Sequence, residues 1–366
     1  MFLKTGRNQL LNIIEAVATY FVVFIHIPFP GYFGNMITAL ARVTVPFYFC
    51  ISGFFFFYTS YEKLTTTIKR KTIRLLKTLL ISECIYYMFY VFLQIKNVGF
   101  SFIAFSNVIR DEFFDYYVPD LANRIAVFSP VFNGVTWFIA TLIVVYLIEF
   151  FITKFNLHKT SLFVFVFSLI ICFVGRRILI HYGIKTPFPY ERIIIFLPLP
   201  FFEIGYAFNI YRAQIEKIKR PYEYLIIIFG IIITIVESFS KTVHTIYLGT
   251  LFIIFGLFIC FIHNPEYSPK SLITKTFSFI GANLTTNIYV YHMLISMFIF
   301  PVINILFPSL QDNIIYLWIK PLLVCFIITL LSYTLYLIKS FIIKCKNNKF
   351  AKTLSSVNSS INQKLS

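Results

Sequence analysis

The feature that most constrains this chain is a series of long, nearly uncharged apolar runs. A helix needs about 20 residues to cross the hydrocarbon core of a bilayer, and only helices or closed barrels satisfy their backbone groups there. Runs of this length without period-two alternation favour helices over barrel strands. The sequence predicts ten spans, at about residues 9–28, 37–59, 75–95, 134–152, 161–181, 193–211, 222–239, 243–263, 278–303 and 314–343. We therefore predict an all-α, polytopic membrane protein.

The overall composition agrees with a membrane location. Only 13% of the residues are charged and 58% are hydrophobic, whereas soluble globular chains carry about 25% charged residues. These values exclude a soluble enzyme, and they exclude a disordered chain, which would need low hydrophobicity and high charge.

The positive charges predict the orientation of the spans. The net charge is +17, and 22 of the 32 Lys and Arg residues fall on one side of the ten spans if the N-terminus is inside. Because cytoplasmic loops are enriched in Lys and Arg, we predict that both termini are cytoplasmic. The same bias accounts for most of the positive charge without a nucleic-acid partner.

The sequence indicates one membrane domain. We assign residues 1–346 to it and predict that residues 347–366, rich in Ser, Asn and Lys, form a polar, disordered cytoplasmic tail. The longest outer connection, about 96–133, is expected to be partly helical and to cover the outer face. The six cysteines show neither zinc-ligand spacing nor a disulfide framework, and no metal site is predicted.

Two polar residues near the outer ends of the first two spans are candidates for chemistry. His26 follows an apolar stretch, and Arg42 precedes Pro46. Titratable residues at membrane depth are costly and often functional. The alternatives are an interfacial histidine bonded to a carbonyl group, and an arginine whose head reaches the membrane surface.

A basic segment lies on the predicted inner side, before the third span. Arg70, Lys71 and Arg74 belong to it, and Lys71 and Arg74 share a helix face. Arginine binds phosphate through two hydrogen bonds and lysine as a point charge, so the segment is a candidate phosphate site. Its charge could instead serve only to orient the protein.

Further polar and aromatic residues occur in the later spans and their outer ends. Several charges at similar depth on separate helices predict a polar cavity, although the sequence cannot show that they converge. For His292 a helix–helix hydrogen bond is the simpler interpretation. The residues predicted to line the cavity are Trp137, Arg177, Glu191, Arg192, Glu237, Tyr289 and His292.

Together these segments resemble acyltransferase family 3, bacterial membrane enzymes with ten spans that acylate cell-surface glycans. The stretch from Arg42 through Pro46 to Ser52-Gly53 is similar to the most specific motif of the family. The helix ending at His26, the pair Lys71 and Arg74, and the segments 134–138 and 288–292 carry weaker resemblances. The similarity runs from about residue 7 to 340. Two positions differ from the usual pattern, because Glu15 and Lys71 stand where the family often has arginine.

The resemblance implies a reaction and its partners. The expected donor is acyl-CoA, with acetyl-CoA as the expected form, and its phosphates on Lys71, Arg74 and Arg70; no permanently bound cofactor is expected. The acceptor is a hydroxyl group of a cell-surface polysaccharide or lipid-linked glycan at the bacterial cytoplasmic membrane. We predict that His26 is the general base, that Arg42 stabilises the oxyanion or orients the acceptor, and that Glu237 completes the catalytic set.

Two other classes of protein remain open from the sequence. A transporter or flippase can also carry buried charges and helices interrupted by proline, but no inverted repeat is visible. A sensor or structural membrane protein would have no need of His26 and Arg42 at membrane depth.

Overall fold

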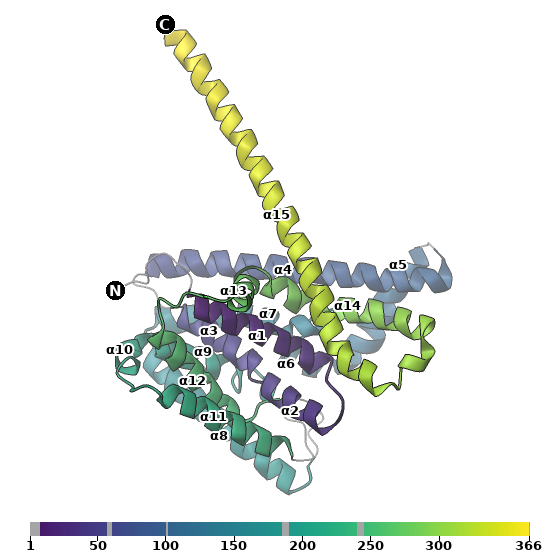
Figure 1. The fold of residues 1–366 in the computed structure, drawn as a ribbon, viewed down its shortest axis with the longest axis vertical. Coiled ribbons are helices and arrows are strands. Elements are labelled where there is room, and N and C mark those ends of the chain that lie inside the picture. Colours follow the sequence, from purple (N-terminus) through teal and green to yellow (C-terminus); the bar gives the residue numbers. More distant parts are fainter. Residues whose placement is uncertain (1–7, 57–60, 100–101, 185–189, 240–244, 366) are drawn as a thin grey trace.

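The computed structural model describes residues 8–56, 61–99, 102–184, 190–239 and 245–365. All regular secondary structure in these ranges is helical (Figure 1), which confirms the predicted all-α class. The longer helices are α1 (Gln9–His26), α2 (Gly31–Ala41), α3 (Thr44–Phe54), α4 (Tyr61–Val98), α7 (Trp137–Lys154), α8 (His158–His181), α9 (Pro198–Ile210), α11 (Tyr222–Ser238), α12 (Leu248–His263), α13 (Leu272–Asn283), α14 (Thr285–Leu306) and α15 (Ile314–Leu365). The shorter ones are α5 (Phe102–Val108), η1 (Ile109–Tyr117), η2 (Val118–Asp120), α6 (Leu121–Ala126), η3 (Gly134–Thr136), η4 (Tyr190–Arg192), α10 (Arg212–Ile215) and η5 (Pro308–Leu310).

Within the described ranges, seven segments are long and apolar enough to cross a membrane. They are Gln9–His26, Gly31–Phe54, Lys63–Ile95, Gly134–Lys154, His158–Leu179, Thr285–Leu306 and Ile314–Cys345. The spans predicted at 193–211, 222–239 and 243–263 correspond to the shorter helices α9, α11 and α12, although residues 243 and 244 lie outside the described ranges. The chain is thus a multi-pass membrane protein, and ten spans with both termini inside remain a prediction.

Helix α1 is at the centre of the bundle. It contacts α2, α3, α13, α14 and α15. Its first turn is capped by Asn8, whose side-chain oxygen accepts a hydrogen bond of 3.0 Å from the backbone NH of Leu11. Because α1 is surrounded in this way, the residue at its last position, His26, lies where several helices meet.

The predicted second span is two helices with a break at Arg42 and Val43. Proline lacks the backbone NH that would bond to the carbonyl group four residues earlier, and its ring clashes with that carbonyl. For Pro46 this carbonyl belongs to Arg42, so α2 ends before Arg42 and α3 begins after Val43. The predicted ninth span is likewise divided, with Leu284 between α13 and α14.

Helices α3 and α9 pack backbone against backbone. A Cβ atom added at Gly53 would lie 1.9 Å from the carbonyl oxygen of Phe202, and one added at Gly205 would lie 1.9 Å from that of Cys50. Small residues permit this close approach of helices in membranes. The Ser52-Gly53 element of the second-span motif therefore has a packing role in this structure.

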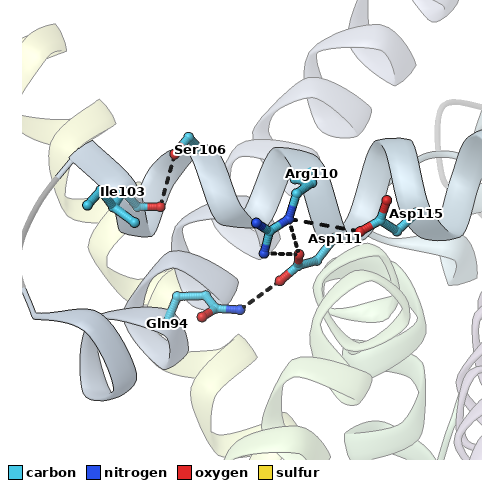
Figure 2. A network of polar contacts seen from close by, with 6 residues as sticks. All are labelled: Gln94, Ile103, Ser106, Arg110, Asp111 and Asp115. Atoms are coloured by element: carbon cyan, nitrogen blue, oxygen red, sulfur yellow. Dashed lines mark hydrogen bonds and ion pairs between the residues drawn. The ribbon is translucent and has the colours of Figure 1, made fainter.

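The connection after α4 is partly helical, as predicted. It forms α5, η1, η2 and α6, and α5 packs against α4 at the far end of that helix (Figure 1). Figure 2 shows the polar contacts that hold it: Gln94 donates a 3.0 Å hydrogen bond to Asp111, and Arg110 forms an ion pair of 2.9 Å with the same carboxylate. Asp115 lies 3.9 Å from Arg110, and the hydroxyl of Ser106 donates to the carbonyl of Ile103.

Helix α15 is the longest element and projects from the bundle (Figure 1). It continues to Leu365 through the segment from residue 347 for which the sequence predicts a disordered tail. The division of the chain at residue 346 remains a prediction.

Three segments predicted to lie on the inner side meet at one end of the bundle. The amide of Asn8 donates to the backbone carbonyls of Phe261 and Asn264, and Arg220 donates to the carbonyl of His263. The beginning of α1 and the loops at 211–221 and 263–271 are thus on the same side of the molecule.

We expect this end to face the cytoplasm, because its three segments belong to the predicted inner set, which carries 22 of the 32 Lys and Arg residues. A green fluorescent protein fused after residue 366 should be fluorescent, and alkaline phosphatase inserted in the 96–133 connection should be active. The same phosphatase inserted near Lys217 serves as the inactive control. An active phosphatase at the C-terminus would contradict the orientation.

Candidate active site

A small cavity of about 30 Å³ brings together five of the residues predicted from the sequence. Its volume is enough for a water molecule or a hydroxyl group. The predicted residues that line it are His26 from α1, Arg42 from the break between α2 and α3, Trp137 from α7, Arg192 from η4 and Tyr289 from α14. Val22, Ile25, Val45, Pro46, Val135, Leu197 and Thr245 complete the lining. The predicted convergence of polar residues from separate helices is therefore seen for these five.

His26 is exposed at the end of α1 and faces the ring of His292. The two ring centroids are 5.3 Å apart and the ring planes are inclined by 44°. His292 is fully buried and does not line the cavity, so it lies behind His26.

The hydrogen bonds of His292 show which of its two ring nitrogens carries the hydrogen. Its Nδ1 lies 2.8 Å from the carbonyl oxygen of Tyr289 and 3.2 Å from that of Ile288. A carbonyl oxygen can only accept, so Nδ1 carries the hydrogen. Nε2 is buried and has no hydrogen-bond partner among the described residues. The simpler sequence interpretation, a hydrogen bond between helices, does not fit, because both carbonyls belong to the same helix, α14.

Arg42 and Arg192 make the cavity electropositive. Both line the cavity together with His26, and Arg192 also stacks over the ring of Trp137 at 5.2 Å. The buried Nε atoms of the two arginines have no partner among the described residues. Guanidinium groups at such a site can stabilise a developing oxyanion.

The wall formed by residues 131–137 is anchored to α4 and α14. The carboxylate of Glu83 accepts hydrogen bonds of 2.9 and 3.0 Å from the backbone NH groups of Phe132 and Asn133. The amide of Asn133 donates to Ser82 and to the carbonyl of Val290, and the hydroxyl of Tyr289 donates to the carbonyl of Val135. These contacts fix the segment that leads into α7. They thereby also fix the position of Trp137, the first residue of that helix.

Glu83 and Asn133 were not among the residues predicted from the sequence. Glu83 could have been found, because it is an acidic residue within a predicted span. Asn133 gives no such signal, since an asparagine at the end of a loop is ordinary.

The structure does not bring Glu237, Glu191 and Arg177 to the cavity. Glu191 pairs with Arg176 at 2.9 Å and accepts from the backbone NH of Thr245. Glu237 lies 3.5 Å from Arg177 and accepts a 2.7 Å hydrogen bond from the NH of Leu248. The two carboxylates thus hold the segment 245–248, from which Thr245 lines the cavity.

The predicted donor-binding residues lie on α4, away from the cavity. Arg70 and Arg74 are exposed, and among the described residues no ion pair is found for either. Lys71 is half-buried, and its Nζ donates to the carbonyl of Phe55 at 3.3 Å and lies 5.3 Å from the ring centre of Tyr146. Two guanidinium groups are therefore free for an anion, whereas Lys71 is attached to the end of α3.

Comparison with known proteins identifies the family. The chain matches the model described as an acyltransferase domain, that of acyltransferase family 3, over residues 8–337. No curated protein and no solved structure matches the chain significantly.

The matched region includes the cavity and the basic row on α4, which consists of Arg70, Lys71 and Arg74. The chain belongs to acyltransferase family 3, and it is a membrane acyltransferase that uses an acyl donor. This confirms the resemblance seen in the sequence and decides against the transporter.

Proposed function

We propose that this protein transfers an acyl group, chiefly acetyl, from cytoplasmic acyl-CoA to a hydroxyl group of a cell-surface polysaccharide or lipid-linked glycan in the bacterial cytoplasmic membrane. The observation that carries the proposal is the cavity that joins His26 to Arg42 and Arg192 in a chain of this family. A histidine beside two guanidinium groups suits acyl transfer, which needs a base and an oxyanion partner.

The proposed chemistry assigns each group a role. The acceptor hydroxyl oxygen attacks the thioester carbonyl of the donor, and His26 takes the hydroxyl proton. Arg42 stabilises the oxyanion of the tetrahedral intermediate, with Arg192 adding positive charge. The C–S bond then breaks, an ester is formed, and the CoA thiolate receives a proton. In a second route, a ring nitrogen of His26 attacks the thioester carbonyl and the CoA thiolate leaves; the acceptor hydroxyl then attacks the acyl-histidine, the imidazole leaves, and the hydroxyl proton is released as the ester forms.

The proposed donor path runs from the basic row on α4 to the cavity. Arg70 and Arg74 are exposed on the predicted inner half of the protein and suit the nucleotide phosphates of CoA. The pantetheine arm then has to cover about half of the hydrocarbon thickness, on the order of 15 Å. This arrangement allows a cytoplasmic donor to serve an acceptor on the other side.

The proposed reaction can be tested in membrane vesicles that contain the protein. Radiolabelled acetyl-CoA supplied on the cytoplasmic side should leave its label in membrane glycan as an alkali-labile ester. Vesicles with the His26→Ala variant are the control. Label that stays in CoA, with wild-type protein folded and glycan present, would contradict the proposal.

Replacement of Arg74 is expected to weaken donor binding. A hydrogen bond to a charged group contributes about 1.5–3 kcal/mol, so the Kd of CoA for Arg74→Ala should rise about 10- to 100-fold, measured by calorimetry on purified protein. Lys217→Ala is the matched control, because Lys217 is also exposed and basic on the predicted inner side. If both variants bind CoA like wild type, Arg74 serves only the membrane orientation.

A further inference from the structure

A second cluster of titratable side chains lies outside the cavity. Glu149 from α7, His158 from α8 and Glu203 from α9 each offer one ligand atom, and these atoms lie within 4.8 Å of one another. Both glutamates are completely buried, and the side chain of His158 is 14% exposed. The acyl-transfer chemistry uses none of the three residues.

The atoms that face each other in this cluster have no hydrogen-bond partners among the described residues. They are both carboxylate oxygens of Glu149, Oε2 of Glu203 and Nδ1 of His158. Nδ1 of His158 lies 3.8 Å from Oε1 of Glu203. Buried polar atoms are normally satisfied, and two adjacent buried carboxylates without a positive partner are strongly unfavourable.

The hydrogen bonds around the cluster prepare the histidine for a metal ion. The hydroxyl of Thr153 donates its only hydrogen to the carbonyl of Glu149 at 2.8 Å. At its contact of 3.0 Å with Nε2 of His158 the hydroxyl must therefore accept, so Nε2 carries the hydrogen. The lone pair of Nδ1 then faces Glu203. Metal-binding histidines characteristically donate their other ring NH to an oxygen in this way.

The surrounding residues also fix the orientation of two ligands. Tyr206 stacks on the ring of His158 with centroids 4.2 Å apart and ring planes inclined by 21°. The hydroxyl of Ser161 contacts both Oε1 of Glu203 and the carbonyl oxygen of His158, which leaves Oε2 of Glu203 available. One imidazole nitrogen and two carboxylates are a ligand set that binds Zn²⁺ at distances of about 2.0–2.2 Å.

We propose that Glu149, His158 and Glu203 bind one divalent transition-metal ion, for which Zn²⁺ fits the ligands best. The double positive charge of the ion neutralises the two buried carboxylates. Ligand atoms around a tetrahedral ion of this kind lie about 3.3–3.6 Å apart, so a pair separated by the full 4.8 Å has to close by about 1.2–1.5 Å. The ion joins the end of α7, the beginning of α8 and the middle of α9, and its role is structural. The proposed metal site does not depend on the proposed acyl donor or acceptor.

The test measures metal content in the full-length protein purified without chelators and incubated with one equivalent of Zn²⁺. After desalting, mass spectrometry of the elements should find about one zinc per wild-type chain and a several-fold loss in Glu203→Gln. Glu223→Gln is the matched control. Glu223 is also buried with both oxygens unpartnered, and it lies 3.4 Å from His263, but no third ligand is found there in the described part of the chain.

A second measurement does not depend on the folding of a variant. The melting temperature of wild-type protein in detergent should fall with EDTA and recover on addition of Zn²⁺ in a saturable manner. Absence of zinc from the wild-type protein, or equal zinc in wild type and Glu203→Gln, would overturn the proposal. In that case the carboxyl groups of Glu149 and Glu203 share protons in place of a metal ion.

Discussion

His26→Gln is expected to lower acyl transfer by about a hundred- to ten-thousand-fold, the usual effect of losing a general base. Glutamine keeps a hydrogen-bonding side chain of similar reach but cannot take a proton at neutral pH. His26 lines the cavity with Arg42 and Arg192, so its loss removes the base and leaves the positive groups in place. The rate is measured as release of CoA thiol from acetyl-CoA in vesicles carrying equal amounts of folded protein.

The control for this experiment is His181→Gln. His181 is also exposed near the end of a membrane helix, α8, but it does not line the cavity. This variant should transfer acyl groups at the wild-type rate. If His26→Gln is equally active, His26 has a structural role, and His292, with its unpartnered Nε2, becomes the candidate base.

Gly205→Ala is expected to destabilise the folded protein strongly. The new Cβ would lie 1.9 Å from the carbonyl oxygen of Cys50, whereas real Cβ atoms essentially never approach closer than 3.0 Å. The clash is with backbone, so no rotamer change relieves it and α3 and α9 must separate by about 1 Å. Overpacking of this kind typically costs about 1–3 kcal/mol, and we expect the upper end of that range here. The measurement is the melting temperature in detergent.

Gly175→Ala is the matched control for Gly205→Ala. Gly175 is also in a membrane helix, α8, but a Cβ added there meets no atom within 4 Å. Because alanine is favoured over glycine in helices by about 0.8–1.0 kcal/mol, this variant should be as stable as wild type or slightly more so. Equal stability of Gly205→Ala would mean that the two helices pack less closely than described.

The two predictions are linked through α3. Arg42 lies two residues before this helix, because Pro46 interrupts the hydrogen-bond ladder there, and α9 supports α3 through the contacts of Gly53 and Gly205. The Gly205→Ala protein that still folds should therefore also transfer acyl groups more slowly than the wild-type protein.

Several conclusions could be reached from local sequence patterns alone. The apolar runs predict an all-helical membrane chain, because a backbone in lipid must satisfy its own hydrogen bonds. The motif from Arg42 to Gly53 indicates the family, and the family match confirms it. His26 and Arg42 could be selected because a charged or titratable side chain at membrane depth is costly unless it has a use.

Other features depend on contacts between residues far apart in the sequence. Only the tertiary structure shows that Arg192 belongs to the cavity while Glu237 holds the start of α12. Only the tertiary structure brings Glu203 to Glu149 and His158. Hydropathy and local motifs determine which segments enter the membrane and which residues are unusual there. Which side chains then meet is decided by how the helices rotate and pack, and that depends on contacts such as Gly205 against Cys50, which no single segment encodes.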